Sequence, residues 1–245
     1  MRLIAIIQAR LGSSRLPGKS LAPIAGESLL AHVGRRVERI GGVDELLIAT
    51  TRVAADDAIY SECKHYDWNC FRGNEVDVLD RFYQAAKARR ADHVLRITAD
   101  CPFVCFEEAG RVIHHHLASQ ADYTHNVTVF GSQMPLGTGT EIFTFASLEA
   151  SWREGMEPHH REHVDEFIPE HPNRFRIEAL PAPAPLRRPD LRLTIDTSED
   201  LELTRQIYGQ LYVPGEPIPL QQVIRFLDEH PDLAEINRHV VQKRI

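Results

Sequence analysis

The sequence predicts an α/β protein in three layers, with a mostly parallel, doubly wound sheet between two layers of helices. Short, continuous apolar runs such as residues 3–7 and 93–98 are typical of strands buried on both faces. Segments with apolar residues at helical spacing follow these runs. Strand and helix alternate about five times in the first half of the chain, which favours parallel strands joined by right-handed crossovers.

The first half begins with the strand over residues 3–7, and a polar loop over 8–19 follows it. Ser28 is expected to cap a helix, because apolar residues recur after it at helical spacing, and Gly41-Gly42 ends that helix. Further strands are expected over residues 45–51, 68–71, 93–98 and 122–126, and further helices over 56–66, 76–90 and 107–118.

The second half is less regular. A glycine-containing loop spans residues 127–141, and the prolines between 181 and 189 indicate an extended connection. Ser198, with acidic residues directly after it, is expected to cap a helix. Strands are expected over residues 141–145 and 191–195, and helices over 146–153, 159–168, 219–229 and 231–238.

The composition excludes several classes of protein. The chain has 245 residues, of which 43% are hydrophobic, and its net charge is −7. No apolar run approaches the roughly 20 residues of a membrane span, and the N-terminus lacks the features of a signal peptide, so we expect no membrane contact and a cytoplasmic location. The acidic balance argues against nucleic-acid binding. The spacing of the four cysteines fits neither a zinc site nor a disulfide framework.

A basic loop directly follows the first predicted strand. Gly12, Ser13 and Ser14 can turn consecutive backbone N–H groups toward a phosphate. Three cations, Arg10, Arg15 and Lys19, lie in the same loop, and Lys19 is notable because only four of the 28 Lys and Arg residues are lysines. Together these groups could hold a triphosphate and neutralise a departing pyrophosphate. The loop matches neither a P-loop nor a Rossmann motif.

Two aspartates end predicted strands. Asp100 follows the strand over 93–98, and Asp196 follows the strand over 191–195. Because parallel strands of one sheet end at a common edge, we expect ligands to bind there, beside the basic loop. Two such carboxylates could coordinate Mg²⁺. Each aspartate could equally be a turn or helix-cap residue, and the spacing alone leaves both interpretations open.

The basic loop, Ala9-Arg10-Leu11-Gly12-Ser13-Ser14-Arg15-Leu16-Pro17-Gly18-Lys19, resembles the nucleotide-binding signature of the cytidylyltransferases that activate sugar acids. It is similar to the form A-R-x-x-S-x-R-L-P-G-K of the 3-deoxy-manno-octulosonate enzymes, and the acylneuraminate enzymes carry a looser form. The similarity runs over residues 1–238 and is greatest to a subgroup concerned with spore coat polysaccharide biosynthesis. Segments that look like this subgroup are 71–75, 77–83, 96–98, 100–102, 161–164 and 195–201.

The resemblance implies a fold of the nucleotide-diphosphosugar transferase type and transfer of CMP from CTP to a sugar acid, with Mg²⁺ as cofactor. A sugar hydroxyl would attack the α-phosphate and pyrophosphate would leave. By position, Lys19, Arg10 and Asp100 would act in catalysis, and Asp100 and Asp196 would hold the metal. The implied nucleotide-binding residues are Ala9, Arg10, Gly12, Ser13, Ser14, Arg15, Lys19, Arg72 and Arg81, and the implied acceptor-binding residues are Glu141, Arg161 and His163.

We therefore expect one cytidylyltransferase-like domain over residues 1–245. An extension at about 127–185 would carry part of the acceptor pocket and mediate a homodimer. The chain departs from the family at Thr98-Ala99-Asp100, where the octulosonate enzymes have Q-G-D. Acidic residues that the family carries near Gly139 and within residues 103–106 are absent as well. These differences fall where the acceptor sugar would lie.

The histidines leave several interpretations open. His159 and His163 are four residues apart on a predicted helix, with His160 beside them. Polar contact with the sugar acid through Arg161 and His163, a surface or dimer-interface position, and a metal site are the alternatives. The run over residues 114–116 points in several directions around a helix, so we expect solvated side chains there.

Two other functions compete with the cytidylyltransferase hypothesis. One is nucleotidyl transfer with another base or another sugar phosphate, because base choice depends on contacts that the sequence does not reveal. The other is a non-catalytic nucleotide-binding protein of polysaccharide assembly. A glycosyltransferase is a further possibility, although the cation-rich loop favours a nucleoside triphosphate over a nucleotide sugar.

Overall fold

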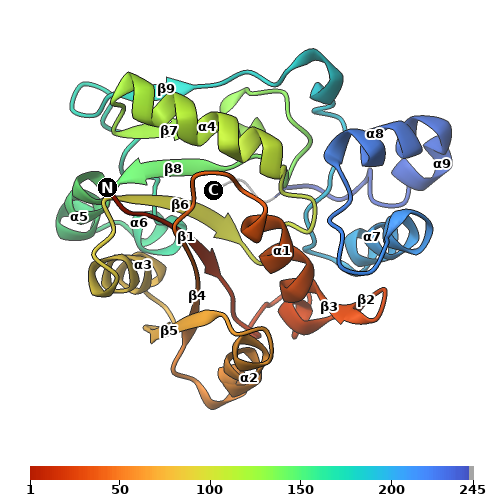
Figure 1. Cartoon of the computed structure of the whole chain (residues 1–245), viewed down its shortest axis with the longest axis horizontal. Coiled ribbons are helices and arrows are strands. Elements are labelled where there is room, and N and C mark those ends of the chain that lie inside the picture. Colours follow the sequence, from red (N-terminus) through yellow and green to blue (C-terminus); the bar gives the residue numbers. More distant parts are fainter. Residues whose placement is uncertain (243–245) are drawn as a thin grey trace.

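The centre of the computed structural model, which describes residues 1–242, is a seven-stranded sheet in the order β5-β4-β1-β6-β8-β7-β9 (Figure 1). Neighbouring strands among β5, β4, β1 and β6 are parallel. β8 is antiparallel to both β6 and β7, and β9 is parallel to β7. The strands are β1 (Leu3–Gln8), β4 (Glu45–Thr51), β5 (Asn69–Gly73), β6 (His93–Thr98), β7 (Tyr123–His125), β8 (Glu141–Thr144) and β9 (Ile177–Ala179).

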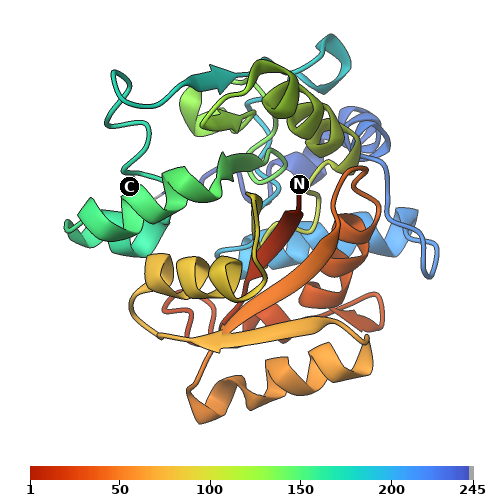
Figure 2. The ribbon, with the colours of Figure 1, turned by 60° about the vertical axis from the view of Figure 1, so that its left-hand side comes forward.

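Helices cover both faces of this sheet, which confirms the predicted three-layer α/β fold. Alternate residues of β1 enter two separate cores: Leu3 and Ile7 pack with α1, α2 and α4, whereas Ile4 and Ile6 pack with α3. Figure 2 shows α2 and α3 on opposite sides of β5. The helices are α1 (Leu29–Glu38), α2 (Asp57–His65), α3 (Val78–Ala88), α4 (Phe106–Ser119), α5 (Phe145–Glu154), α6 (Pro158–His163), α7 (Ser198–Leu211), α8 (Leu220–Glu229) and α9 (Pro231–Ala234).

Side-chain caps set the beginnings of several helices. Ser28 Oγ accepts a hydrogen bond from the Ala31 N–H group at 3.0 Å, as expected for the N-cap of α1. The expected cap at Ser198 is wrong by one residue. Thr197 caps α7, and Asp200 completes a capping box with it.

The segment over residues 191–195 is not the strand that its apolar pattern predicts. Its backbone bonds to two different partners: the Leu193 N–H group donates to Leu136 O, and the Ile195 N–H group donates to Asp100 O. A single bridge between Leu136 and Arg192 remains. The segment forms no continuous ladder, because its hydrogen bonds are divided between the segments around Leu136 and Asp100.

Two predicted helices end early. α6 stops at His163, since Val164 adopts a positive φ of 52°, and the helix predicted over 159–168 is shorter by five residues at that end. α9 covers Pro231–Ala234 of the range 231–238. Two elements carried no clear sequence signal: β9 and the short hairpin of β2 (Pro23–Ile24) and β3 (Glu27–Ser28). None of the helices in residues 1–242 has the length and apolarity that a membrane span needs.

Candidate active site

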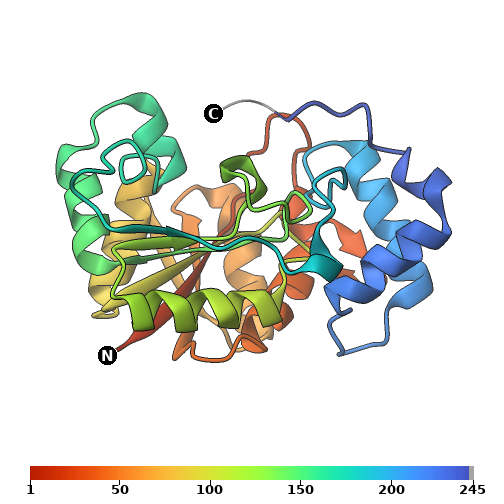
Figure 3. The ribbon, with the colours of Figure 1, turned by 90° about the horizontal axis from the view of Figure 1, so that it is seen from above.

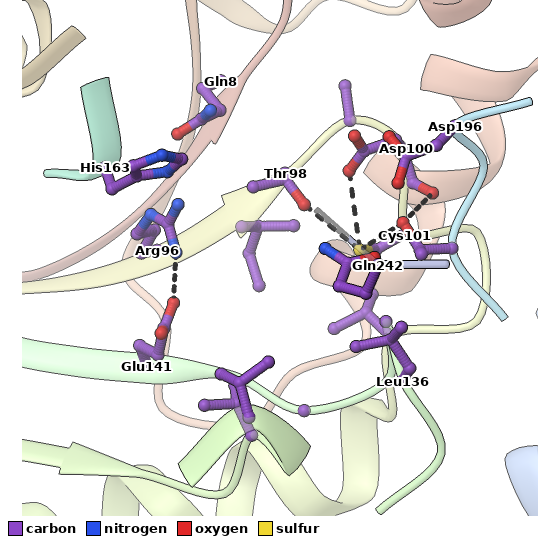
Figure 4. A pocket seen from close by; sticks show the side chains of 18 of the residues that line it. Gln8, Arg96, Thr98, Asp100, Cys101, Leu136, Glu141, His163, Asp196 and Gln242 are labelled. Carbon is purple, nitrogen blue, oxygen red and sulfur yellow. Dashed lines mark hydrogen bonds and ion pairs between the residues drawn. The ribbon is translucent and has the colours of Figure 1, made fainter. Parts of the chain in front are cut away.

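A cavity of about 570 Å³ opens where β1 and β6 end. Its two ends differ in chemistry, as Figure 4 shows with Asp100 and Asp196 on one side and Arg96, Glu141 and His163 on the other. The loop end is lined by Ser13, Ser14, Arg15, Lys19, Asp100 and Asp196, and the sheet end by Arg96, Glu141, Glu162, His163, Asp165 and Glu166. The C-terminal segment returns toward the basic loop (Figure 3), and Gln242 lines the cavity (Figure 4).

The basic loop is held in place by side chains at both ends. The Leu11 N–H group donates to Asp56 Oδ1 at 2.8 Å, and Ser20 Oγ donates to Arg10 O at 3.0 Å. Gly18 has φ 75° and leads into the short helix Lys19–Leu21, a conformation that favours glycine. Within residues 1–242, the backbone N–H groups of Gly12, Ser14 and Arg15 find no acceptor. Such amides are suited to bind an anion.

Lys19 connects both predicted aspartates. Its Nζ donates to Asp100 Oδ2 at 2.8 Å, to Asp196 Oδ1 at 3.0 Å and to Ile195 O at 2.6 Å. Burial lowers the pKa of Lys19, but Asp100 and Asp196 outweigh burial and raise that pKa above the ordinary lysine value. Burial raises the pKa of Asp100, but the charge of the Lys19 ammonium group outweighs burial. The pKa of Asp100 is therefore lowered from its ordinary value. Lys19 is therefore a cation and Asp100 an anion at neutral pH.

A buried network that the sequence analysis missed supports Asp196. Arg192 donates to Asp196 Oδ2 at 2.7 Å and to Asp200 Oδ1 at 2.9 Å. Asp200 also accepts from the Asp196 N–H group at 2.9 Å and from Asn237 Nδ2 at 2.8 Å. The one available signal was the spacing of Arg192 four residues before Asp196 and eight before Asp200. This network fixes the rotamer of Asp196, so Arg192 and Asp200 are positioning residues.

The chemistry of the loop end fits a divalent cation. The carboxylates of Asp100 and Asp196 converge on one point, which the Lys19 ammonium group occupies. Hard divalent cations prefer such oxygen ligands. Asp100 Oδ1 has no cationic partner among the described residues, whereas both oxygens of Asp196 contact guanidinium groups, of Arg15 at 2.9 Å and of Arg192 at 2.7 Å. Asp100 is thus the more available of the two ligands.

The sheet end is built around Arg96. Its NH1 donates to Glu141 Oε2 at 2.5 Å and lies 3.4 Å from Asp165 Oδ1. Tyr123 OH donates to Asp165 Oδ2 at 2.8 Å. Burial and then the Glu141 charge raise the pKa of Asp165 well above its usual range. Burial also raises the pKa of Glu141, but Arg96 outweighs it and the pKa is lowered. Asp165 therefore favours the protonated acid and Glu141 the carboxylate.

The structure brings most of the predicted site residues to this cavity, but not all of them. Ala9 and Arg81 line only a smaller neighbouring hollow of about 120 Å³, whereas Arg10 lines both spaces. Arg72 and Arg161 line neither space. Arg72 donates to Thr51 O and pairs with Asp57, and Arg161 Nε donates to Asp77 Oδ2 at 2.9 Å. Gly12 also lines neither the cavity nor the smaller hollow, although other residues of its loop line the cavity.

The histidines divide into different environments. His163 lines the cavity, and burial lowers its pKa, so its imidazole is neutral at pH 7. Among residues 1–242, His159, His160 and Glu170 form the one group whose possible ligand atoms lie within 4.8 Å of one another. His163 is not part of it. His160 Nδ1 accepts from the Glu157 N–H group at 3.3 Å, which leaves Nε2 as the protonated nitrogen that donates to Glu170 Oε2 at 2.7 Å. That tautomer favours an ordinary hydrogen bond over a metal.

The expectation of a solvated histidine is wrong for His116. This side chain is fully buried, and its Nδ1 lies 2.9 Å from Thr124 Oγ1. Burial lowers the pKa of His116 to about 4. The four cysteines are free thiols. Cys101 lies beside Asp100, and burial raises the pKa of its thiol to about 12, which leaves it unsuited as a nucleophile.

Comparison with known proteins shows the family to which the chain is similar. A cytidylyltransferase family model matches residues 4–223. The spore coat polysaccharide biosynthesis protein SpsF of Bacillus subtilis is 35% identical over 95% of this chain and 96% of its own. A 3-deoxy-manno-octulosonate cytidylyltransferase of Mesorhizobium japonicum is 26% identical over 84% of this chain and 99% of its own. A solved cytidylyltransferase structure from Leptospira borgpetersenii covers 100% of both chains at 26% identity, with a TM-score of 0.89.

The family model covers most of the chain, and SpsF exceeds 30% identity over nearly the whole of both chains. Both findings agree with the resemblance seen in the basic loop and in the segments that follow it. The chain is thus a nucleotidyltransferase and belongs to the cytidylyltransferase family.

Proposed function

We propose that this protein transfers CMP from CTP to a sugar hydroxyl, releases pyrophosphate, and serves the synthesis of a surface polysaccharide. The observation that carries this proposal is the placement of Lys19 between Asp100 and Asp196, next to a loop with three backbone amides that have no acceptor among residues 1–242. The printed names of SpsF and of the octulosonate enzymes support the polysaccharide assignment.

In this proposal the triphosphate binds at the loop end of the cavity. The amides of Gly12, Ser14 and Arg15 would donate to phosphate oxygens. Arg10 and Arg15 would contact the phosphates with their guanidinium groups, which suit bidentate contact with phosphate. Phosphoryl transfer needs charge neutralisation and positioning more than covalent catalysis. The loop end supplies both, because its cations lie on a loop tied down by Asp56.

Asp100 and Asp196 would hold Mg²⁺, which supplies Lewis-acid chemistry at phosphate oxygens when bound. The Lys19 ammonium group would stabilise the negative charge that develops on the departing pyrophosphate. Arg192 and Asp200 keep Asp196 in its rotamer throughout. The neutral imidazole of His163 lies at the opposite end of the cavity, where the acceptor sugar would bind.

The first test is a thermal-shift panel of CTP, UTP, ATP and GTP, each with and without Mg²⁺. A ligand that binds only the native state stabilises it by about 2.7 kcal/mol at one hundred times its dissociation constant. We expect the largest shift with CTP and Mg²⁺. A larger shift with another triphosphate would move the assignment to that base, and no shift with any of the four would contradict triphosphate binding and with it the proposed function.

The second test is pyrophosphate release in an Asp100→Asn variant. We expect turnover to fall about a hundredfold or more, because the variant loses a charged group that acts at the phosphates. Asp232→Asn is the matched control, since Asp232 is exposed in α9 and does not line the cavity. Equal turnover of Asp100→Asn and the control would remove Asp100 from the mechanism.

A further inference from the structure

The segment after α9 contributes a side chain to the cavity that no sequence motif points to. It returns toward the basic loop (Figure 3), and its residue Gln242 lines the cavity together with Asp100 and Asp196 (Figure 4). The cytidylyltransferase family model ends before this segment, at residue 223. The role of Gln242 therefore has to be judged from its own contacts.

Two side chains fix this segment to the buried network that supports Asp196. Asn237 is 2% exposed, and its Nδ2 donates to Arg192 O at 3.0 Å and to Asp200 Oδ1 at 2.8 Å. Arg192 NH1 in turn donates to Gln242 Oε1 at 2.6 Å. The segment is thus held at both of its ends, which gives the Gln242 side chain a defined position at the cavity.

The contact with Arg192 decides which way the Gln242 amide faces. A guanidinium group has donors and no acceptor, so the amide turns its oxygen toward Arg192 and its NH2 group away from it. That NH2 group has no acceptor among residues 1–242. Because Gln242 lines the cavity, its two N–H groups are available to a ligand there.

One planar group links this amide to a predicted metal ligand. The Arg192 guanidinium group donates to Asp196 Oδ2 at 2.7 Å and to Gln242 Oε1 at 2.6 Å. Asp196 Oδ1 lies 2.9 Å from Arg15 NH2 and 3.0 Å from Lys19 Nζ. The Gln242 amide therefore belongs to the same contact network as two cations that the proposed function places at the phosphates.

The chemistry of the NH2 group selects a ligand that accepts hydrogen bonds. Phosphate oxygens are acceptors and carry charge, which strengthens the hydrogen bonds that they accept. The amide adds donors to the loop end without adding charge. Its orientation is set by Arg192 before a ligand binds, so little side-chain entropy is lost on binding.

We infer that Gln242 is a triphosphate-binding residue, whose side-chain NH2 group donates to a phosphate oxygen while Arg192 holds its carbonyl oxygen. Asn237 is then a positioning residue for the segment that carries it. This inference rests on the proposed function, because it assumes that a nucleoside triphosphate binds at the loop end. It extends the phosphate site from the basic loop to the C-terminal segment.

The experiment measures the dissociation constant of CTP with Mg²⁺ by calorimetry, without an acceptor sugar, for the wild type and two variants. Gln242→Ala removes the donor, and we expect the constant to rise about tenfold, as for the loss of one hydrogen bond to a charged group. Gln242→Glu keeps an oxygen for Arg192 but replaces the donor by a negative charge. The constant should then rise about a hundredfold or more.

Matched controls and a spectroscopic signal separate a contact with the ligand from a structural role. Gln222→Ala and Gln222→Glu, at an exposed position in α8, should leave the affinity unchanged. The side-chain NH2 signals of Gln242 in a ¹⁵N NMR spectrum are identified by their absence from the Gln242→Ala spectrum. They should move when CTP and Mg²⁺ are added, whereas those of Gln222 should not.

Three results would each overturn the inference. Wild-type affinity in Gln242→Ala would show that the donor makes no contact. Wild-type affinity in Gln242→Glu would reduce the residue to an anchor for Arg192, since the carboxylate retains that contact. Gln242 NH2 signals that stay in place on saturation with CTP would exclude a hydrogen bond to the nucleotide.

Failure of the proposed function looks different. In that case the wild-type protein binds none of the four triphosphates. If another triphosphate binds more tightly than CTP, the variants are compared with that triphosphate, because the inference concerns the phosphates and not the base.

Discussion

The Lys19 side chain joins three parts of the chain that are distant in sequence. Its ammonium group contacts Asp100 and Asp196 and the carbonyl oxygen of Ile195 at distances of 2.6–3.0 Å. A lysine fits here because its charge is compact, whereas a guanidinium group is planar and wider. The exceptional use of lysine in an arginine-rich sequence therefore has a geometric reason.

Replacement of Lys19 by Met should lower the rate of pyrophosphate release about a hundred- to a thousandfold, as expected when one electrostatic contact to developing charge is removed. Lys19→Arg should also be impaired, since the larger group does not fit between the two carboxylates. Lys64→Met, an exposed change in α2, is the control. Wild-type rates in Lys19→Met would exclude a role for this ammonium group at the phosphates.

His116 should make the stability of the protein depend on pH. Its folded pKa of about 4 lies below the ordinary value of 6.5, so the unfolded chain binds a proton that the folded protein does not. The free energy of unfolding should therefore fall as the pH decreases from 6.5 toward 4, by at most about 3 kcal/mol. Urea unfolding at several pH values measures this slope. The slope should be smaller in His116→Gln, and an identical slope would assign it to other groups.

At the scale of elements, the loop over residues 135–140 depends on close backbone packing. Gly137 has φ 87°, and a Cβ atom there would lie 2.7 Å from Thr194 Cβ and 2.8 Å from the Thr194 backbone nitrogen. Thr194 precedes Ile195 and Asp196, which contact Lys19. Residues 135–140 thereby support, through Thr194, the segment that carries Asp196 at the loop end of the cavity.

Gly137→Ala should destabilise the protein by about 2 kcal/mol or more, because the left-handed conformation and the contact with Thr194 are both unfavourable. It should also slow pyrophosphate release by displacing Asp196. Gly209→Ala is the matched control: Gly209 is exposed within α7 with open space around it, and alanine there should stabilise by about 0.5–1 kcal/mol. Urea unfolding compares the two, and equal effects would contradict the packing argument.

At the scale of the whole molecule, β8 lies between β6 and β7 and reverses the local direction of the sheet. This insertion brings Glu141, the first residue of β8, opposite Arg96. It also places residues 127–140 over one side of the cavity. The sheet topology therefore creates the sheet end, where the acceptor is proposed to bind.

The homodimer predicted for the extension over residues 127–185 can be tested at its exposed apolar side chains. Val129, Phe130 and Met156 are 52%, 39% and 72% exposed. Light scattering should give twice the chain mass of 27.8 kDa. Met156→Asp should weaken this dimer, and Val213→Asp, at an exposed position outside the extension, should not. A mass of a single chain at micromolar concentration would contradict the prediction.

Local patterns predicted the elements well where one segment carries the whole signal. β4 and β6 have the predicted bounds, because a continuous apolar run marks a strand that is buried on both faces. The run over residues 191–195 has a similar apolar pattern and is buried as well, yet it forms one isolated bridge and no ladder. Burial alone does not distinguish a ladder from a single bridge.

The sequence by itself determined the α/β class, the basic loop after β1 and the two aspartates that follow apolar segments, since each depends on neighbouring residues. The tertiary structure alone decided which charges meet. Arg161 pairs with Asp77, 84 residues away, and does not line the cavity, while the Arg96 charge is paired with the Glu141 carboxylate. The charge of a cavity is the sum of contacts between distant segments, and no local pattern encodes that sum.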